Sequence, residues 1–497
     1  MEIIDNLIKG SSLVFGLGPI LTIIVGVMMG ILVGVLPGLS PAMGVALLVP
    51  FSYGLDPLSA LILLVSVYAA ANYGGTITAI AINTPGTPSA IVSTFDGYPL
   101  TKKGEPGRAL GASVISSTIG GIFGTIVLIF FSVPLAKIAL TFGPAEYFAL
   151  AVFGLTIVSS LSTGNWIKAF IATLLGLLLN TIGMDPFTGY LRFTFDIPEL
   201  ADGFSFIPAL IGLFALGEIF LSIEKSEKVK KVLKKVSGKM PSVKEMWNIK
   251  RTIAQSSLLG TLIGVVPGAG ATIAAFIAYN EAKRISKHPE EFGKGALDGV
   301  ASSGAATSGS VGGALVPLLT LGIPGSAATA VLIGALVLHG ITPGPELFKN
   351  DAPLVYGLFV SLFFAYIAMF FMGFLGNQLW IKIIKAPKSI LYPVILAIAF
   401  IGSYSVGNSM FDVWSCFGFG VFGWILRRNN FPTPPVILGL ILGFLAETNF
   451  RRALLMGDAS IFFTRPISAV MLTLAALSLF YPLIKATILK KNKKLNI

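Results

Sequence analysis

Four Pro-Gly pairs interrupt apolar stretches of this 497-residue chain, at Pro37-Gly38, Pro85-Gly86, Pro267-Gly268 and Pro324-Gly325. Proline removes a backbone N–H and glycine admits conformations that other residues avoid, so such a pair ends a helix. Inside a membrane the freed backbone groups must be satisfied by protein, water or a ligand. Helix N-termini at these breaks would attract anions, and unwound carbonyl groups suit Na+. The four pairs therefore predict binding positions, and ordinary helix kinks are the alternative.

Small hydroxyl and amide side chains gather around these breaks. Such groups can hydrogen-bond a carboxylate and coordinate sodium without carrying charge. Tight helix packing also favours Gly, Ala, Ser and Thr, and for Gly299–Gly313 the two interpretations are evenly balanced. We expect substrate or ion contacts from Pro37, Gly38, Ser40, Asn72, Thr76, Asn83, Thr84, Pro85, Gly86, Thr87 and Ser89, and from Pro267, Gly268, Gly270, Thr307, Ser308, Gly322, Pro324, Gly325, Ser326 and Thr329.

The elements that position these residues are apolar helices. Hydrophobic residues make up 54% of the chain and charged residues only 12%, whereas soluble domains carry about 25% charged residues. Apolar runs recur along the whole length, and a spanning helix needs roughly 20 apolar residues. The sequence predicts an all-α polytopic membrane protein with about 11 to 13 spans, some of them broken or re-entrant.

Two phrases occur twice, in the same order. The run Gly30–Ser40 matches Gly260–Gly270 at an offset of 230 residues. The interval from Gly74-Gly75 to Pro85-Gly86 is matched by that from Gly312-Gly313 and Ala314 to Pro324-Gly325, at an offset of 239 residues. This pattern predicts two related repeats, which we expect to be inverted, as in many transporters. We divide the chain into a first transport repeat (1–223), a basic loop (224–251), a second repeat core (252–350) and additional helices with a scaffold or subunit-contact role (351–497).

The net charge of +12 is concentrated in the loop 224–251 and in the C-terminal tail 485–497. The positive-inside rule places both segments in the cytoplasm. Only Trp247 could stack on a base in the basic loop, so we expect the lipid bilayer as surroundings and no nucleic acid. Two further charged stretches, Asp96–Arg108 and Glu281–Lys294, are interpreted as solvent-exposed loops.

Cysteine and histidine are too scarce for most metal or redox chemistry. Cys416 is the sole cysteine, which excludes an intrachain disulfide and fits a bacterial or archaeal cytoplasmic (inner) membrane. With only His288 and His339 available, we expect no cofactor, with Na+ as a candidate coupling ion. A Ser/His hydrolase that pairs His339 with Ser308 or Ser310 is one alternative, although no nucleophile motif surrounds these serines. An ion or solute channel is another.

Six stretches resemble TctA, the large membrane subunit of tripartite tricarboxylate transporters. They are Gly34–Gly44, Tyr73–Ser89, Asp96–Pro99, Gly264–Gly270, Ser286–Gly295 and Leu319–Thr329. The resemblance implies a non-enzymatic secondary transporter that imports small carboxylates, such as citrate, with a cation gradient. It also implies a small four-helix membrane partner and a periplasmic or extracellular solute-binding protein. Alternating access would then occur around the paired Pro-Gly breaks.

One segment departs from the family pattern. After Asp298-Gly-Val-Ala, the family usually carries Pro-Glu and then an Asn-Asn pair. This chain has Gly304 where the acid is expected, and Thr307 and Ser308 where the amides are expected. The departure predicts a different substrate, ion or set of partners.

Overall fold

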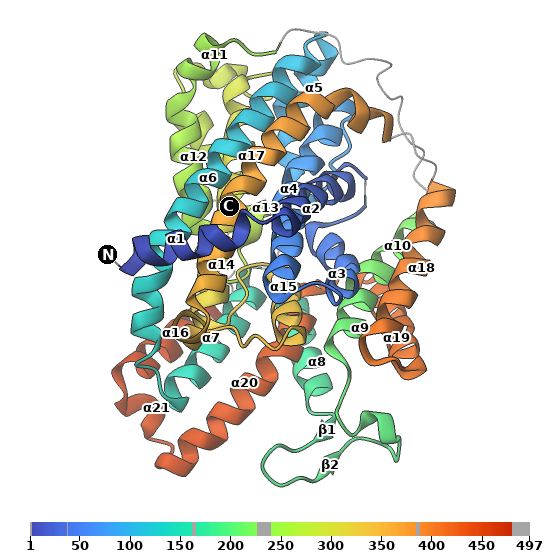
Figure 1. The fold of residues 1–497 in the computed structure, drawn as a ribbon, viewed down its shortest axis with the longest axis vertical. Helices are drawn as coiled ribbons and strands as arrows, with labels where there is room; N and C mark the ends of the chain where they lie inside the picture. Colours follow the sequence, from blue (N-terminus) through green and yellow to red (C-terminus); the bar gives the residue numbers. More distant parts are fainter. Residues whose placement is uncertain (1, 37, 162–165, 226–239, 384–387, 480–497) are drawn as a thin grey trace, which may run out of the picture. The chain divides into compact units, whose positions relative to one another are not determined.

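The computed structural model describes residues 2–36, 38–161, 166–225, 240–383 and 388–479 (Figure 1). Most of them are helical and strands are almost absent among them, which confirms the all-α polytopic membrane fold. Seven helices are long and apolar enough to cross a membrane, and five shorter apolar helices accompany them within the described ranges. Pro37, half of the basic loop (226–239) and the basic C-terminal tail lie outside the described residues.

The helices form two compact units. Unit 1 comprises Met1–Lys137 and Ile207–Trp424, and unit 2 comprises Ile138–Phe206 and Ile425–Ile497. The elements of unit 1, including three that run past its borders (α6, α9 and α19), are α1 (Glu2–Val14), α2 (Leu17–Val35), α3 (Pro41–Ser52), α4 (Pro57–Ile82), η1 (Pro88–Ala90), α5 (Ile91–Lys102), α6 (Pro106–Ala139), α9 (Phe206–Ile211), the π-helical η3 (Gly212–Leu216), α10 (Gly217–Lys225), α11 (Val243–Asn248), α12 (Lys250–Val265), α13 (Gly270–Ile285), η4 (Pro289–Glu291), α14 (Leu297–Leu321), α15 (Ala327–Leu338), α16 (Pro345–Asn350), α17 (Ala352–Ile383), α18 (Lys388–Gly407) and α19 (Met410–Arg428).

Unit 2 holds a smaller set of helices and one short hairpin. Its elements are α7 (Pro144–Leu161), α8 (Trp166–Asn180), β1 (Gly183–Met184), β2 (Leu191–Arg192), η2 (Pro198–Leu200), α20 (Pro434–Met456) and α21 (Ile461–Thr464). Helix α20 lies against both α7 and α8. The two strands are antiparallel and pair Gly183 with Arg192 and Met184 with Leu191.

Two helices form the buried centre of unit 1 and end in the same way. Helix α4 begins at the N-cap Asp56, whose carboxylate accepts the Ser59 N–H at 3.1 Å. It ends at Asn83, which has a left-handed backbone (φ 56°), two residues before Pro85. Helix α14 ends at Gly322 (φ 71°), two residues before Pro324. Both Pro-Gly pairs therefore follow a left-handed helix cap that terminates a buried helix.

Each of these helices has a glycine-lined partner. Helix α2 lies along α4, and α12 lies along α14 (Figure 1). A Cβ on Gly34 of α2 would collide with the carbonyl oxygen of Ala71, and a Cβ on Gly264 of α12 would collide with that of Ser310. Only glycine allows the backbones of each pair to approach so closely.

Both charged stretches that were expected to be solvent-exposed loops differ from that expectation. Glu281–Lys294 is largely exposed, but it begins with the last residues of α13 and includes η4. Asp96–Arg108 is not a solvent-exposed loop, because its first part forms α5 and its last part begins α6. The Asp96 side chain is fully buried. The local charge suggested exposure, but the carboxylate is satisfied by backbone N–H groups of a distant segment, which sequence reasoning could not locate.

Candidate functional site

The first-half break beyond α4 is built from small polar side chains that contact one another. The hydroxyl groups of Thr87 and Ser89 lie 3.1 Å apart, and Ser89 donates to the side-chain oxygen of Asn72 at 3.4 Å. The Asn72 amide in turn donates to the Tyr68 carbonyl at 3.0 Å. Thr87, Ser89 and Asn72 are all buried. The structure thus brings these three predicted site residues together.

The cap residues of this break have backbone roles. Asn83 is exposed, and Thr84, which is half-buried, donates its backbone N–H to the Thr78 carbonyl at 3.4 Å. Gly86 follows Pro85 and donates its N–H to the Gly75 carbonyl at 3.2 Å. The break therefore folds back onto the helix that it terminates.

The breaks after α2 and α12 differ from each other. Gly38 is exposed with φ 95°, and the Ser40 hydroxyl caps α3 by accepting the Met43 N–H at 3.2 Å. In the second half, Gly268 donates its N–H to the Gly325 carbonyl at 3.1 Å. Pro267 and Pro324 precede these two glycines, and Gly270 is the first residue of α13. The two Pro-Gly pairs of the second half are thus joined directly by a hydrogen bond.

The second-half break is linked to the first half. Ser326 and Thr329 form a reciprocal capping box at the start of α15, so their hydroxyl groups have a structural role in capping this helix. The Ser326 hydroxyl also lies 3.0 Å from the Tyr68 hydroxyl near the middle of α4. In addition, α15 lies against α3 and α4, whereas η1, which follows the first-half break, lies against α13 and α14. Each half of the chain therefore contacts the segment that follows the Pro-Gly break of the other half.

Helices α4 and α14 run in opposite directions. Gly97 of α5 packs on Ile80 near the end of α4, and its neighbour Asp96 accepts the N–H of Ala296, one residue before α14 begins. Ser326, which lies beyond the other end of α14, reaches the middle of α4 through Tyr68. The start of α14 thus lies beside the end of α4.

A group of neutral hydroxyl side chains lies where these two helices meet α5 and α6. Thr76 and Ser113 lie 2.8 Å apart, as do Ser93 and Ser303. A Cβ at Gly304 would lie 2.7 Å from the Ser116 hydroxyl oxygen and 2.9 Å from that of Ser117. With Thr307 and Ser308 from the next turn of α14, we name this group the serine cluster: Thr76, Ser93, Ser113, Ser116, Ser117, Ser303, Thr307 and Ser308. All eight side chains are buried.

Three hydroxyl groups of the serine cluster lack a hydrogen-bond partner among the residues that the structure describes, namely those of Ser117, Thr307 and Ser308. A buried hydroxyl without a partner costs about 1–3 kcal/mol. The Ser308 carbonyl, by contrast, accepts the Tyr366 hydroxyl at 3.0 Å. Hydroxyl oxygens with free lone pairs can coordinate a cation, and their hydrogens can donate to a carboxylate.

The buried carboxylate of Asp96 links the two halves of the chain, and we call this set of contacts the Asp96 clasp. One oxygen of Asp96 accepts the N–H groups of Gly293, Gly295 and Ala296, each at 2.8 Å, and the other accepts the Tyr279 hydroxyl at 2.8 Å. The clasp joins two of the stretches that carry the family resemblance, Asp96–Pro99 and Ser286–Gly295. It ties a first-half helix to a second-half loop.

Sequence reasoning missed the members of the serine cluster on α5 and α6. A signal for α6 is present, because Ser113, Ser116 and Ser117 are followed by Gly120, Gly121 and Gly124 at helical spacing. In place of the pairing that the hydrolase alternative expected, the His339 ring nitrogen Nε2 lies 3.1 Å from the Ser52 hydroxyl, and the Ser310 hydroxyl donates to the Thr307 carbonyl at 2.7 Å.

Comparisons with known proteins found two relatives and one matching family model. Two proteins of Agrobacterium vitis are similar to this chain. The first, "Uncharacterized 52.8 kDa protein in TAR-I ttuC' 3'region", is 37% identical over 495 residues and 99% of both chains. The second, "Uncharacterized protein in TAR-II ttuC' 3'region", is 36% identical over 47% of this chain and 98% of its own length.

No solved structure matches this chain. The model of the tripartite tricarboxylate transporter TctA family matches residues 20–438, which is most of the chain. The match includes all four Pro-Gly pairs and the serine cluster. The chain therefore belongs to the tripartite tricarboxylate transporter TctA family.

Proposed function

We propose that this chain is the translocating membrane subunit of a tripartite transporter, and that it imports small carboxylates by cation-coupled alternating access. The observation that carries the proposal is the meeting of the antiparallel helices α4 and α14 at a buried cluster with three unpartnered hydroxyl groups among the described residues. Tricarboxylates such as citrate are the first substrates to test. The protein would lie in a bacterial or archaeal inner membrane, with residues 224–251 and the C-terminus in the cytoplasm.

Matched contacts support two inverted repeats as the basis of alternating access. In the first half, Gly30 and Gly34 approach Val67 and Ala71, respectively. In the second half, Gly260 and Gly264 approach Ala306 and Ser310. Ala306 and Ser310 lie 239 positions after Val67 and Ala71. The opposite directions of α4 and α14 agree with inversion. In transporters of this kind, substrate and ion bind between the repeats and the two halves move around them.

The chemistry of the serine cluster suits a carboxylate that enters with a cation. A bare carboxylate is costly in a membrane interior, and a bound cation offsets its charge. Neutral hydroxyl groups, together with carbonyls freed at the breaks after α4 and α14, can coordinate Na+ while other donors hold the acid. The departure at Gly304, Thr307 and Ser308 lies within this cluster, so we infer that it sets the substrate or the ion.

The breaks that border the cluster would complete the site. We propose that the carbonyls of Pro85, Gly86 and Pro324 and the N–H of Gly325 contribute with Asn72, Thr87 and Ser89. The predicted positions at Ser40, Ser326 and Thr329 have capping roles in this conformation. These residues would contribute to substrate binding only if the N-termini of the helices that they cap face the substrate.

Uptake into proteoliposomes tests the proposal. The chain would be reconstituted with its small membrane partner and its solute-binding protein, and labelled citrate, a dicarboxylate and a monocarboxylate would be supplied under an inward Na+ or H+ gradient. We expect accumulation that collapses when the coupling gradient is dissipated. Uptake that is indifferent to both ionophores, or flux that never exceeds the outside concentration, would contradict a coupled transporter and favour a channel.

A further inference from the structure

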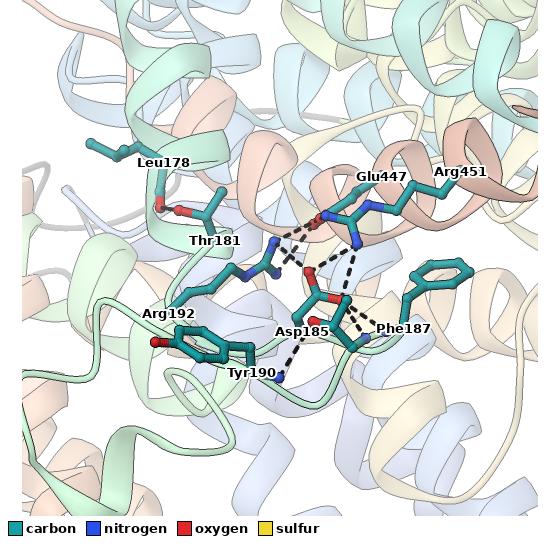
Figure 2. Close-up of polar contacts among 9 residues, drawn as sticks. Leu178, Thr181, Asp185, Phe187, Tyr190, Arg192, Glu447 and Arg451 are labelled. Atoms are coloured by element: carbon teal, nitrogen blue, oxygen red, sulfur yellow. Dashed lines mark hydrogen bonds and ion pairs between the residues drawn. The ribbon is translucent and has the colours of Figure 1, made fainter.

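Unit 2 carries a hairpin that is fixed by an unusual concentration of charge. Asp185, directly after β1, accepts the backbone N–H groups of Phe187 and Thr188 at 2.8 and 3.1 Å and binds Arg451 of α20 at 2.9 Å (Figure 2). These N–H groups and Arg451 lower the pKa of the Asp185 carboxyl to about 2. Arg192, in β2, lies 3.5 Å from Asp185.

The network is closed by a second carboxylate on α20. Glu447 binds Arg192 at 2.7 Å and Arg451 at 2.9 Å, so two carboxylates and two guanidinium groups alternate (Figure 2). In such an alternating arrangement, several ion pairs share the entropic cost of ordering each side chain. An isolated surface ion pair, by contrast, contributes little to stability. The base of the hairpin is therefore rigidly attached to α20.

The rigid base presents aromatic side chains that nothing in the described part of the chain covers. Tyr190 and Phe195 are each 77% exposed, and Phe193 is 59% exposed. Phe193 and Phe195 also have left-handed backbones, with φ 54° and 50°. Bulky residues rarely adopt this conformation, which is energetically costly and concentrates at functional positions. The loop thus holds large apolar groups in solvent at a conformational cost.

Acidic residues follow these aromatics in the same loop. Asp196, Glu199 and Asp202 are all exposed, and no ion pair is formed by them among the described residues. Exposed aromatic side chains accompanied by polar residues match the composition of a protein-binding hot spot. The excess negative charge opposes contact with an anionic lipid surface, which attracts basic segments instead. The charge therefore favours a protein partner over the bilayer surface.

Chain topology places the hairpin away from the cytoplasm. The apolar helix Phe206–Glu224 is long enough to cross the membrane, and it separates the hairpin from the basic loop 224–251. If the basic loop is cytoplasmic, the hairpin is on the outer side, where substrate arrives.

We propose that residues 190–202 dock the soluble solute-binding subunit of the transporter, through the aromatic side chains of Tyr190, Phe193 and Phe195 and the exposed carboxylates of the same loop. This inference rests on the proposed function, because it takes the family's soluble subunit as the occupant. The docking face of that subunit would carry apolar pockets bordered by Lys and Arg. Steering between the acidic loop and this basic face would speed association at low salt.

A binding measurement with matched variants tests the docking surface. The full chain would be placed in nanodiscs of phosphatidylethanolamine and phosphatidylglycerol, and binding of the purified solute-binding subunit would be followed by interferometry. Phe193→Asn and Phe195→Asn keep a residue that accepts positive φ, and each should weaken binding by about tenfold. Phe463→Asn is the control, because Phe463 is similarly exposed (72%) in the same unit but lies on α21.

Charge reversal and uptake add independent readouts. Glu199→Lys should reduce the association rate at low salt and have less effect at high salt. In proteoliposomes, Phe195→Asn should raise the concentration of soluble subunit that gives half-maximal uptake while leaving the maximal rate unchanged. Wild-type affinity in both phenylalanine variants, or loss of binding in Phe463→Asn alone, would overturn the docking surface.

A spin label distinguishes protein docking from lipid insertion. Phe195→Cys can be labelled selectively because Cys416 is buried. A nitroxide there should be accessible to a water-soluble nickel complex and become protected only when the soluble subunit is added. Protection by lipid alone would overturn the proposal. Uptake that does not require the soluble subunit would overturn the proposed function, whereas uptake that requires it but tolerates the hairpin variants would overturn only the docking surface.

Discussion

Thr307 and Ser308 place two hydroxyl groups in the interior of unit 1 without a partner among the described residues. If these groups serve binding, their removal should not harm the fold. We expect Ser308→Ala and Thr307→Val to leave the free energy of unfolding unchanged or to raise it by up to about 1–3 kcal/mol. Uptake of substrate, measured in proteoliposomes, should fall at least tenfold in both variants.

The neighbouring Ser310 is the matched control. Its hydroxyl donates to the Thr307 carbonyl at 2.7 Å, so Ser310→Ala should cost about 1 kcal/mol of stability and keep most of the uptake. Thermal unfolding can be followed by reaction of a thiol dye with Cys416, which is buried in the folded chain. Stability losses in Thr307→Val and Ser308→Ala that exceed the loss in Ser310→Ala would point to a packing role instead.

The Asp96 clasp supports a second residue-scale prediction. Asp96→Ala leaves three backbone N–H groups and the Tyr279 hydroxyl without their acceptor. Because these are bonds to a buried charge, we expect a loss of ~3 kcal/mol in the same thiol-dye assay. Asp56 is the control, because it is exposed and caps α4, so Asp56→Ala should cost only about 1 kcal/mol. Equal effects of the two changes would contradict the clasp.

Residue types and spacing identified only part of the candidate site. Asn72, Thr87 and Ser89 were predicted and do contact one another, because they flank one break in a single stretch of sequence. Ser93 and Ser113 belong to other helices and reach the same region through tertiary packing, which one sequence does not specify. Asp96 was misjudged because a charged residue usually signals exposure, whereas its partner Ala296 lies 200 residues away.

Glycine contacts between paired helices give a prediction at the scale of elements. Gly34→Ala would drive a methyl group into the Ala71 carbonyl, so we expect a loss of about 1–3 kcal/mol, together with separation of α2 from α4. Gly264→Ala should act alike on α12 and α14. Gly18 of α2 has open space around it, so Gly18→Ala should be neutral or stabilise by up to about 1 kcal/mol. The thiol-dye assay measures all three, and equal losses at Gly18 and Gly34 would contradict the close approach of the helices.

The hairpin of unit 2 should respond to pH through Asp185. Its pKa is lowered from 3.8 to about 2, so its contribution to the attachment is complete above about pH 4 and is lost as the pH falls through about 2. A nitroxide at position 195 should therefore become mobile between these values. Asp185→Asn should make it mobile already at about pH 5 and remove the transition. Identical spectra for the two proteins at that pH would show that the network does not hold the hairpin.

The elements themselves were largely predictable. Long apolar runs forced helices, and Pro-Gly pairs ended them where expected, since α4 and α14 stop just before Pro85 and Pro324. The two-residue strands β1 and β2 were not predicted, because they are too short to show alternation. The charge network behind them joins residues 255 positions apart, Arg192 and Glu447.

The orientation of the chain in the membrane can be tested by labelling introduced cysteines, because Cys416 is the sole natural cysteine. In whole cells, a membrane-impermeant maleimide should label Asp196→Cys from outside and should label Lys244→Cys only after the membrane is opened. The buried Cys416 keeps the background low. Labelling of Lys244→Cys in intact cells would reverse the topology and place the hairpin in the cytoplasm.

The neutrality of the serine cluster has a consequence for the energetics of the whole transport cycle. None of its eight side chains is ionisable at physiological pH, so the cluster brings no charge of its own to a moving site. Any current across the bilayer would then equal the charge of the cargo, that is, of the acid plus its cations. Each uncompensated charge gains or loses about 2.3 kcal/mol per 100 mV of membrane potential. The number of cations bound per carboxylate would therefore decide whether the voltage drives, opposes or ignores uptake.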